Sequence, residues 1–195
     1  MSICRRLTSI LLPLAIPLVA MAAGQSSHPR DATDQSPQNA SQHRHDLSPL
    51  IDKVRNATAR FKDINVATAE AFVQGTPCVS GPNSGAMGVH FVRPDRIAGG
   101  VLNADQPEAL IYEPMPGGEL RLVGVEFIVL AGGWDKKHPG VPPALDGHLL
   151  NLVDAPNRFG LPAFYELHVW AWEQNPVGSF ADWNTHVSCE QQPAT

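Results

Sequence analysis

The sequence Leu161-Pro-Ala-Phe-Tyr-Glu-Leu-His-Val-Trp-Ala-Trp-Glu-Gln-Asn-Pro176 predicts a β-strand more clearly than any other part of the chain. Aromatic and β-branched residues dominate it, and a proline stands near each end. Because successive side chains of a strand point to opposite faces, one face is predicted to carry Phe164, Glu166, His168, Trp170 and Trp172. A carboxylate and an imidazole on such a face are costly to bury without polar partners. This strand is therefore the first candidate for a functional site.

Two further predicted strands each carry one polar residue in apolar surroundings. Residues 87–92 read as a strand with His90 among valine and phenylalanine. Residues 107–112 and 119–130 predict a β-hairpin, because turn-forming residues connect them at 115–118. Glu126 is the exception in the second hairpin strand, which is apolar on both faces. Strict alternation places the following residues of that strand on one face: Leu120, Leu122, Gly124, Glu126, Ile128 and Leu130.

The beginning of the folded region predicts helices. Ser48-Pro49 supplies an N-cap and a residue suited to the first turn, and apolar residues then recur at helical spacing. We predict one helix over 49–62 and a shorter one over 63–72. The predicted fold class is α+β, a single domain with two N-terminal helices packed on a mainly antiparallel β-sheet.

The first 47 residues are predicted to lie outside this domain. Arg5 and Arg6, the apolar run 7–21 and the small residues at 20–22 are typical of a signal peptide over 1–22. The run is too short for a stable membrane span, which needs roughly 20 apolar residues. Residues 23–47 are polar and predict a disordered leader before the domain at 48–195. The protein is thus expected to be exported to the periplasm or the extracellular space and to be soluble there.

The charge balance disfavours nucleic acid as a partner. The chain has 14 Lys and Arg against 19 Asp and Glu, a net charge of −5. No stretch forms the basic stripe that nucleic-acid binding requires.

Signal cleavage would remove Cys4 and leave Cys78 and Cys189 as an even pair. An oxidising compartment favours a disulfide between them, near the two ends of the predicted domain. A metal-thiolate pair and two free thiols are the alternatives, although no C-x-x-C spacing is present.

Several blocks of sequence carry a family resemblance, and the block that ends at Trp170 is the most specific. They are Arg60-Phe61-Lys-Asp63, Gly85-Ala-Met-Gly-Val-His90-Phe, Pro107-Glu-Ala-Leu-Ile-Tyr-Glu-Pro114, Leu120-Arg-Leu-Val-Gly-Val-Glu126, Phe164-Tyr-Glu-Leu-His-Val-Trp170, Asn175-Pro176, Gly178, Phe180, Asp182-Trp-Asn184 and Val187-Ser-Cys189. On these blocks the chain resembles a widespread family of small exported bacterial proteins with no established biochemical function. Thr185 and Ala71-Phe72 depart from the family pattern, which has proline and Gly-Tyr there. The resemblance implies export and the domain limits but no reaction.

The three isolated polar residues, His90, Glu126 and His168, predict a metal site. Two imidazoles and a carboxylate are a common ligand set for zinc or non-haem iron. Glu166 is the candidate outer carboxylate that orients a ligand, and Trp170 the candidate shield against water. Metal loading is expected to fail once the imidazoles protonate near pH 6. Whether the protein is an enzyme stays open at this stage.

Two other functions compete with metal binding. Trp134, Trp170, Trp172 and Trp183 are candidates for the aromatic floor of a metal-free pocket for a small ligand. A structural or interaction role in the cell envelope, with all buried polar groups hydrogen-bonded, is the third interpretation. The long Gly- and Pro-rich segment 131–158 is predicted to pack down as a lid or flap. Nucleophilic hydrolases and c-type haem are disfavoured, since neither G-x-S-x-G nor C-x-x-C-H occurs.

Overall fold

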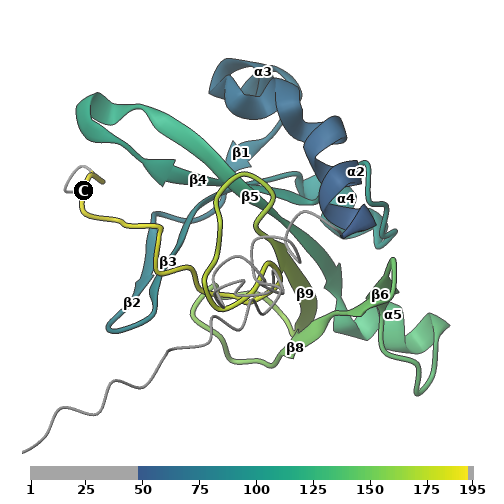
Figure 1. The fold of residues 1–195 in the computed structure, drawn as a ribbon. Helices are drawn as coiled ribbons and strands as arrows, with labels where there is room; N and C mark the ends of the chain where they lie inside the picture. The colour runs from purple at the N-terminus through teal and green to yellow at the C-terminus, as the bar shows by residue number, and fades with distance from the viewer. Residues whose placement is uncertain (1–47, 193–195) are drawn as a thin grey trace, which may run out of the picture. The chain divides into compact units, whose positions relative to one another are not determined.

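The computed structural model describes residues 48–192, which contain one large antiparallel sheet and several short helices (Figure 1). The strands of the sheet follow the order β1-β3-β4-β5-β9-β8, and β2 pairs with β3 beside this path. Their bounds are β1 (Val73–Gln74), β2 (Val79–Gly81), β3 (Gly85–Val92), β4 (Ala109–Pro114), β5 (Leu120–Leu130), β8 (Asn151–Val153) and β9 (Phe164–Val169). A separate two-stranded sheet pairs β6 (Ala144–Leu145) with β7 (His148–Leu149).

The helices are distributed along the described chain. They are α2 (Pro49–Thr58), the 3-10 helices η1 (Ala59–Lys62) and η2 (Pro116–Gly118), α3 (Ile64–Ala69), α4 (Pro94–Gly99) and α5 (Ala131–Lys137). The α+β class and the single antiparallel sheet are thus confirmed. The expectation that the helices precede the sheet holds for α2 and α3. It does not hold for α4, which follows β3, or for α5, which follows β5.

Helix α2 is held to the sheet by an apolar stripe. Leu50, Ile51 and Val54 are fully buried, as the helical spacing of the sequence indicates. They pack against side chains on one face of the sheet and form a core with them. We call this side of the sheet the helix face. The hydroxyl of Tyr112 donates a hydrogen bond of 2.7 Å to the carbonyl of Phe61 in this core. Besides these, the buried core includes Ala67, Phe72, Val89, Phe91, Ala104, Leu110, Leu122, Val125, Phe127, Val129, Leu145, Leu150, Leu167, Val169 and Ala171.

The opposite face of the sheet, here called the polar face, is covered by two smaller apolar clusters with polar residues between them. One cluster consists of Ala86, Ile111, Val123, Trp170 and Val187. The other is built on Ala109, Ile128 and Phe164, with part-buried residues from α4 and the segment before β9. The C-terminal segment crosses the first cluster, where Asn184 bridges to Ala86 of β3 (Figure 1).

The β4–β5 hairpin contains a shift in register that strict alternation misses. Ile111 lies opposite Gly124, whereas the next residue, Tyr112, lies opposite Leu122. The extra residue, Val123, turns to the polar face, and Leu122 turns to the helix face. The face predicted for Leu120 and Leu122 was therefore wrong, because one inserted residue exchanges the two faces.

Strand β9 ends sooner than the sequence suggests. The amide of Ala171 donates to the carbonyl of Val169, so the chain turns sharply there. Trp172 consequently leaves the face of Trp170, and its Nε1 donates to the hydroxyl of Thr58 on α2. The placement of Trp172 beside His168 and Trp170 was wrong for this reason.

Residues 131–158 are not one long loop. They form α5, the β6–β7 pair and β8, and β8 pairs antiparallel with β9 as an edge strand of the main sheet. The interpretation of this segment as a lid is therefore replaced by that of an ordered sheet edge. The residues that follow this segment, Phe159, Leu161 and Pro162, line a cavity on the polar face.

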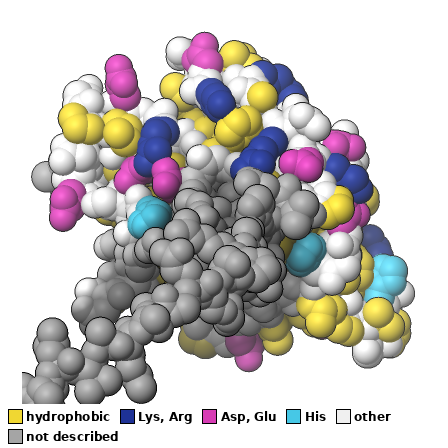
Figure 2. Space-filling model, in the orientation of Figure 1, with side chains coloured by type: hydrophobic (Ala, Val, Ile, Leu, Met, Phe, Trp, Pro, Cys, Tyr) yellow, Lys and Arg dark blue, Asp and Glu magenta, His cyan; other side chains and the backbone are white. Residues whose placement is uncertain are grey.

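The predicted signal peptide (1–22) and leader (23–47) lie outside the described residues. Within residues 48–192, no helix is long and apolar enough to cross a membrane. On the face shown in Figure 2, Lys and Arg side chains are interspersed with Asp and Glu side chains. Ion pairs among the described residues include Lys53–Asp146 and Arg60–Glu70.

Cys78 and Cys189 form the predicted disulfide, with their Cα atoms 5.6 Å apart. Both sulfur atoms are thus engaged, which excludes the alternative of a metal-thiolate pair. The bond joins the segment before β2 to the C-terminal segment, which covers one end of the polar face.

Replacing Cys78 and Cys189 together by serine is expected to lower the free energy of unfolding by about 4 kcal/mol. The bond spans 111 residues, and its loss frees the unfolded chain from a long closed loop. Urea denaturation of wild type and variant measures the difference, and wild type in reductant should resemble the variant. Recovery of both cysteines as alkylated thiols from unreduced protein would contradict the bond.

Candidate metal centre

Strand pairing brings the three suspected residues together on the polar face. Glu126 of β5 lies directly opposite His168 of β9. His90 lies on β3, one strand farther away, because β4 runs between β3 and β5. On β4, Ala109 is the register partner of Glu126 and Ile111 is the register partner of His90, so the two polar residues lie diagonally across this strand. His90 Nε2 and Glu126 Oε2 are 3.5 Å apart.

His90 is held in place by its other ring nitrogen. The hydroxyl of Thr76 lies 3.2 Å from His90 Nδ1 and also accepts a hydrogen bond from the His90 amide. The side chain is 5% exposed, and burial lowers the pKa of His90 from 6.5 to about 4. The imidazole is therefore neutral near pH 7 and presents Nε2 to Glu126.

His168 is completely buried, yet neither of its ring nitrogens has a hydrogen-bond partner in the described part of the chain. Its ring lies edge-on to that of His90, with centroids 5.8 Å apart, and is stacked with Trp170 at 6.1 Å. Asp182 Oδ1 lies 3.9 Å from Nδ1, too far for a hydrogen bond. Burial lowers the pKa of His168 to about 3, with a further contribution from His90.

Glu126 and Glu166 form a carboxyl pair. Both side chains are buried on the polar face, close enough for each carboxyl to affect the pKa of the other. Burial and the neighbouring Glu166 raise the pKa of Glu126 well above its usual range, and burial also raises the pKa of Glu166. Glu166 thus contacts Glu126, in addition to lying near His168 as the sequence suggested. We call His90, Glu126, Glu166 and His168 the polar centre.

Two overlapping sets of side chains could hold a metal ion. His90, Glu126 and His168 form one set, and Glu166, His168 and Asp182 form the other, with ligand atoms within 4.8 Å of one another in each. His168 belongs to both. Because burial keeps the imidazoles neutral below pH 6, the expectation that they protonate near pH 6 is revised downwards.

A cavity of about 390 Å³ opens beside the polar centre. All four residues of the centre line it, together with Thr76 at the same wall. The rest of its lining is apolar: Met87, Val92, Pro94, Ile97, Ala98, Ile128, Leu130, Phe159, Leu161, Pro162 and Phe164, with Gly75 at the rim.

None of the four tryptophans lines this cavity. Trp170 packs in the cluster with Ala86, Ile111, Val123 and Val187, and Trp172 packs against the helix-face core. Trp134 stacks on His138 of its own segment, and Trp183 contacts Gly81. The aromatic rings at the cavity are Phe159 and Phe164 instead.

Sequence reasoning missed Thr76 and Asp182. Thr76 stands in an irregular glycine- and proline-rich segment, where no periodicity indicates its direction. Asp182 belongs to the block Asp182-Trp-Asn184 that carries the family resemblance, and this was the one available signal.

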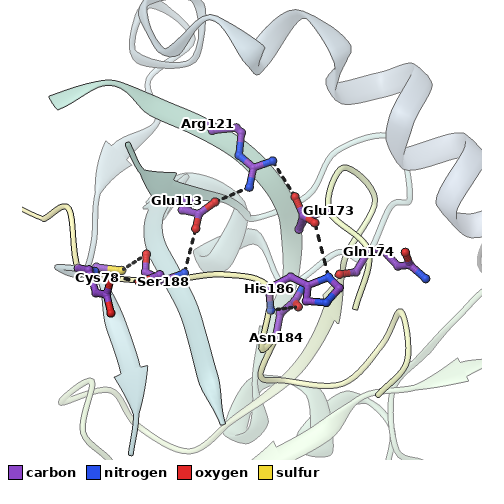
Figure 3. Close-up of polar contacts among 9 residues, drawn as sticks. Cys78, Glu113, Arg121, Glu173, Gln174, Asn184, His186 and Ser188 are labelled. Atoms are coloured by element: carbon purple, nitrogen blue, oxygen red, sulfur yellow. Dashed lines mark hydrogen bonds and ion pairs between the residues drawn. The ribbon is translucent and has the colours of Figure 1, made fainter. Parts of the chain in front are cut away.

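A second polar cluster shows what complete pairing looks like in this molecule (Figure 3). Arg121 forms ion pairs with both Glu113 and Glu173. The second carboxylate oxygen of Glu113 accepts a hydrogen bond from the backbone amide of Ser188. His186 Nδ1 lies 3.8 Å from Glu173. This cluster ties the C-terminal segment beside Cys189 to the hairpin, and we assign it a structural role.

Comparison of the chain with models of known protein families, with characterised proteins and with solved structures finds no match.

Glu108 is a further buried carboxyl, located outside the polar centre just before β4. Its Oε2 accepts a hydrogen bond of 3.0 Å from the backbone amide of Ile128. Burial raises the pKa of Glu108 from 4.5 to about 7. A carboxyl group whose pKa is higher in the folded protein than in the unfolded chain contributes to stability. This contribution is fully present below the pKa of the unfolded chain, about 4.5. That stability is lost as the pH rises through the folded value near 7.

Glu108→Gln is therefore expected to have little effect on stability near pH 4 and to raise it near pH 8 by about 2–3 kcal/mol, since the amide stays neutral. Denaturation of wild type and variant between pH 4 and 8 measures the difference. A difference that does not change across this range would show that Glu108 titrates normally in the fold.

Proposed function

We propose that this domain binds one divalent transition metal ion, zinc or iron, through His90, Glu126 and His168. Two neutral imidazoles and one carboxylate are a ligand set that both metals accept. The protein would act as an exported metal-binding domain, in keeping with the predicted signal peptide, the family resemblance and the disulfide.

The observation that carries the proposal is that both ring nitrogens of His168 are buried and lack a hydrogen-bond partner among the described residues. Leaving a buried nitrogen donor or acceptor without a partner costs about 1–3 kcal/mol. Among the described residues, the only other buried side-chain atom in this state is the hydroxyl oxygen of Ser48. His168 belongs with His90 and Glu126 to one candidate ligand set and with Glu166 and Asp182 to the other. A metal ion would give one of its nitrogens a partner and would share Glu126.

The surroundings suit ligation. Thr76 holds His90 by Nδ1 and directs Nε2 at the centre, which is the arrangement that fixes a ligating imidazole. Asp182 stands near His168 Nδ1, and a small movement would let it accept a hydrogen bond and orient that ring. Three protein ligands would leave an open coordination position, as in catalytic rather than structural zinc sites.

The test is metal content after removal of bound ions and reloading with zinc, using protein without a His-tag. Wild type is expected to retain about one zinc per chain. Glu126→Gln, which keeps the shape but cannot ligate as an anion, should weaken zinc affinity at least ~100-fold, more than typical losses of outer-shell partners. His168→Ala should do the same. Zinc at ~100 times its dissociation constant should also stabilise wild type by about 2.7 kcal/mol.

His186→Ala is the matched control, because His186 is about half exposed and belongs to the structural cluster. It should bind zinc as wild type does. The metal-free stability of Glu126→Gln should stay close to that of wild type, since a neutral side chain is already favoured at this position. Equal zinc uptake by wild type, Glu126→Gln and His168→Ala would leave the trio a structural role and end the proposal.

A further inference from the structure

The cavity beside the polar centre has its polarity gathered at one end. His90, Glu126, Glu166 and His168 form that end, and the remaining walls are almost entirely aliphatic or aromatic. A volume of about 390 Å³ is within the range of sites for small organic molecules. Such a distribution matches a molecule with an apolar body and a single polar end.

The apolar walls come from several separate parts of the chain, including β3 and β9. Helix α4 supplies Ile97 and Ala98, the segment before β9 supplies Phe159 and Leu161, and β5 supplies Ile128. The cavity is therefore formed by tertiary packing on the sheet. One of its residues, His168, is fully buried and has two unpartnered nitrogens, so the polar end offers an unsatisfied group to a ligand.

We propose that this cavity binds a small monocarboxylate with an apolar body, aliphatic or aromatic, whose carboxylate contacts the metal at the polar centre. The inference rests on the proposed metal site for the contact at the carboxylate end. The apolar body lies among the side chains of α4, the segment 159–162 and Phe164.

Charge favours an anion at the polar end. A divalent ion with two neutral imidazoles and one carboxylate carries a net charge of +1, and burying an uncompensated charge is costly. Three protein ligands leave an open coordination position, which a carboxylate oxygen of the ligand can fill. Asp182 is about one-third exposed to solvent, so it is not enclosed with the ion as the ligand would be. A single carboxylate from the ligand brings the ion and its three ligands to neutrality.

The experiment is calorimetric titration of the zinc-loaded and the metal-free protein with three probes. Octanoate has both the apolar body and the carboxylate, acetate has only the carboxylate, and octan-1-ol has the body with a neutral end. Octanoate should bind the zinc-loaded protein at least ~100-fold more tightly than acetate, because its additional methylene groups enter the apolar part. It should also bind at least ~10-fold more tightly than octan-1-ol, and this second advantage should disappear without metal.

Two variants fill the cavity without touching the polar centre. Ala98→Phe on α4 and Leu161→Trp on the opposite border should each abolish octanoate binding while zinc content stays at the wild-type level. Ala59→Phe, at an exposed position on η1, is the matched control and should bind octanoate as wild type does. Cobalt(II) in place of zinc gives a visible spectrum that octanoate should change and acetate should not at the same concentration.

The failures of the two proposals can be told apart. Normal zinc uptake without octanoate binding would overturn the cavity assignment and leave the metal site standing. Octanoate affinity that is equal with and without metal would overturn the carboxylate–metal contact. Octanoate binding that persists in both blocking variants would place it outside the cavity and overturn the inference. Absence of zinc binding in wild type would end the proposed function and, with it, the contact proposed here.

Discussion

The register of β5 against its two neighbours is the constraint on which the rest of the site depends. Pairing with β9 sets Glu126 opposite His168, and pairing with β4 sets Glu126 opposite Ala109. The first pairing joins a carboxyl to an imidazole. The second places Glu126 one strand away from His90, whose Nε2 lies 3.5 Å from Glu126 Oε2. A slip of one residue would send Glu126 into the helix-face core and dissolve the centre, because side chains alternate between the faces.

The two faces of the sheet differ in composition: one carries the main apolar core, and the other carries the cavity and the polar centre. On the helix face, Leu50, Ile51 and Val54 of α2 join a continuous apolar core with β3, β4, β5 and β9. Among the described residues, the polar face has two smaller apolar clusters, and Ile128 and Phe164 of the second line the cavity beside the polar centre. The disulfide and the Arg121 cluster hold the C-terminal segment over one end of that face. The helix face can therefore keep the domain folded while the polar face retains unsatisfied groups.

The sequence predicted residue types and strand positions better than it predicted faces at irregular points. His90, Glu126 and His168 stood out because each interrupts an apolar strand, and such interruptions can be read locally. Cys78 and Cys189 were paired from their number and compartment. Leu122 was misplaced because the register shift at Ile111 has no local signature, and Trp172 because the turn after Val169 depends on contacts with α2. Thr76, Asp182 and the cavity arise from segments that only tertiary packing brings to the site.

The polar centre is difficult to explain by stability alone. Well-packed apolar residues in place of buried charged or polar groups are often neutral or stabilising. Trp170, Ile111, Ile128 and Phe164 already surround the centre with apolar side chains that such residues could join. Instead, burial lowers the pKa of both imidazoles and raises the pKa of both carboxyls, and His168 has no hydrogen-bond partner among the described residues. The structural cluster around Arg121 shows that this fold can satisfy its charged groups. His168, with its unpartnered nitrogens, lies where an apolar cavity reaches the sheet, and the proposed ion and its proposed ligand would account for both features together.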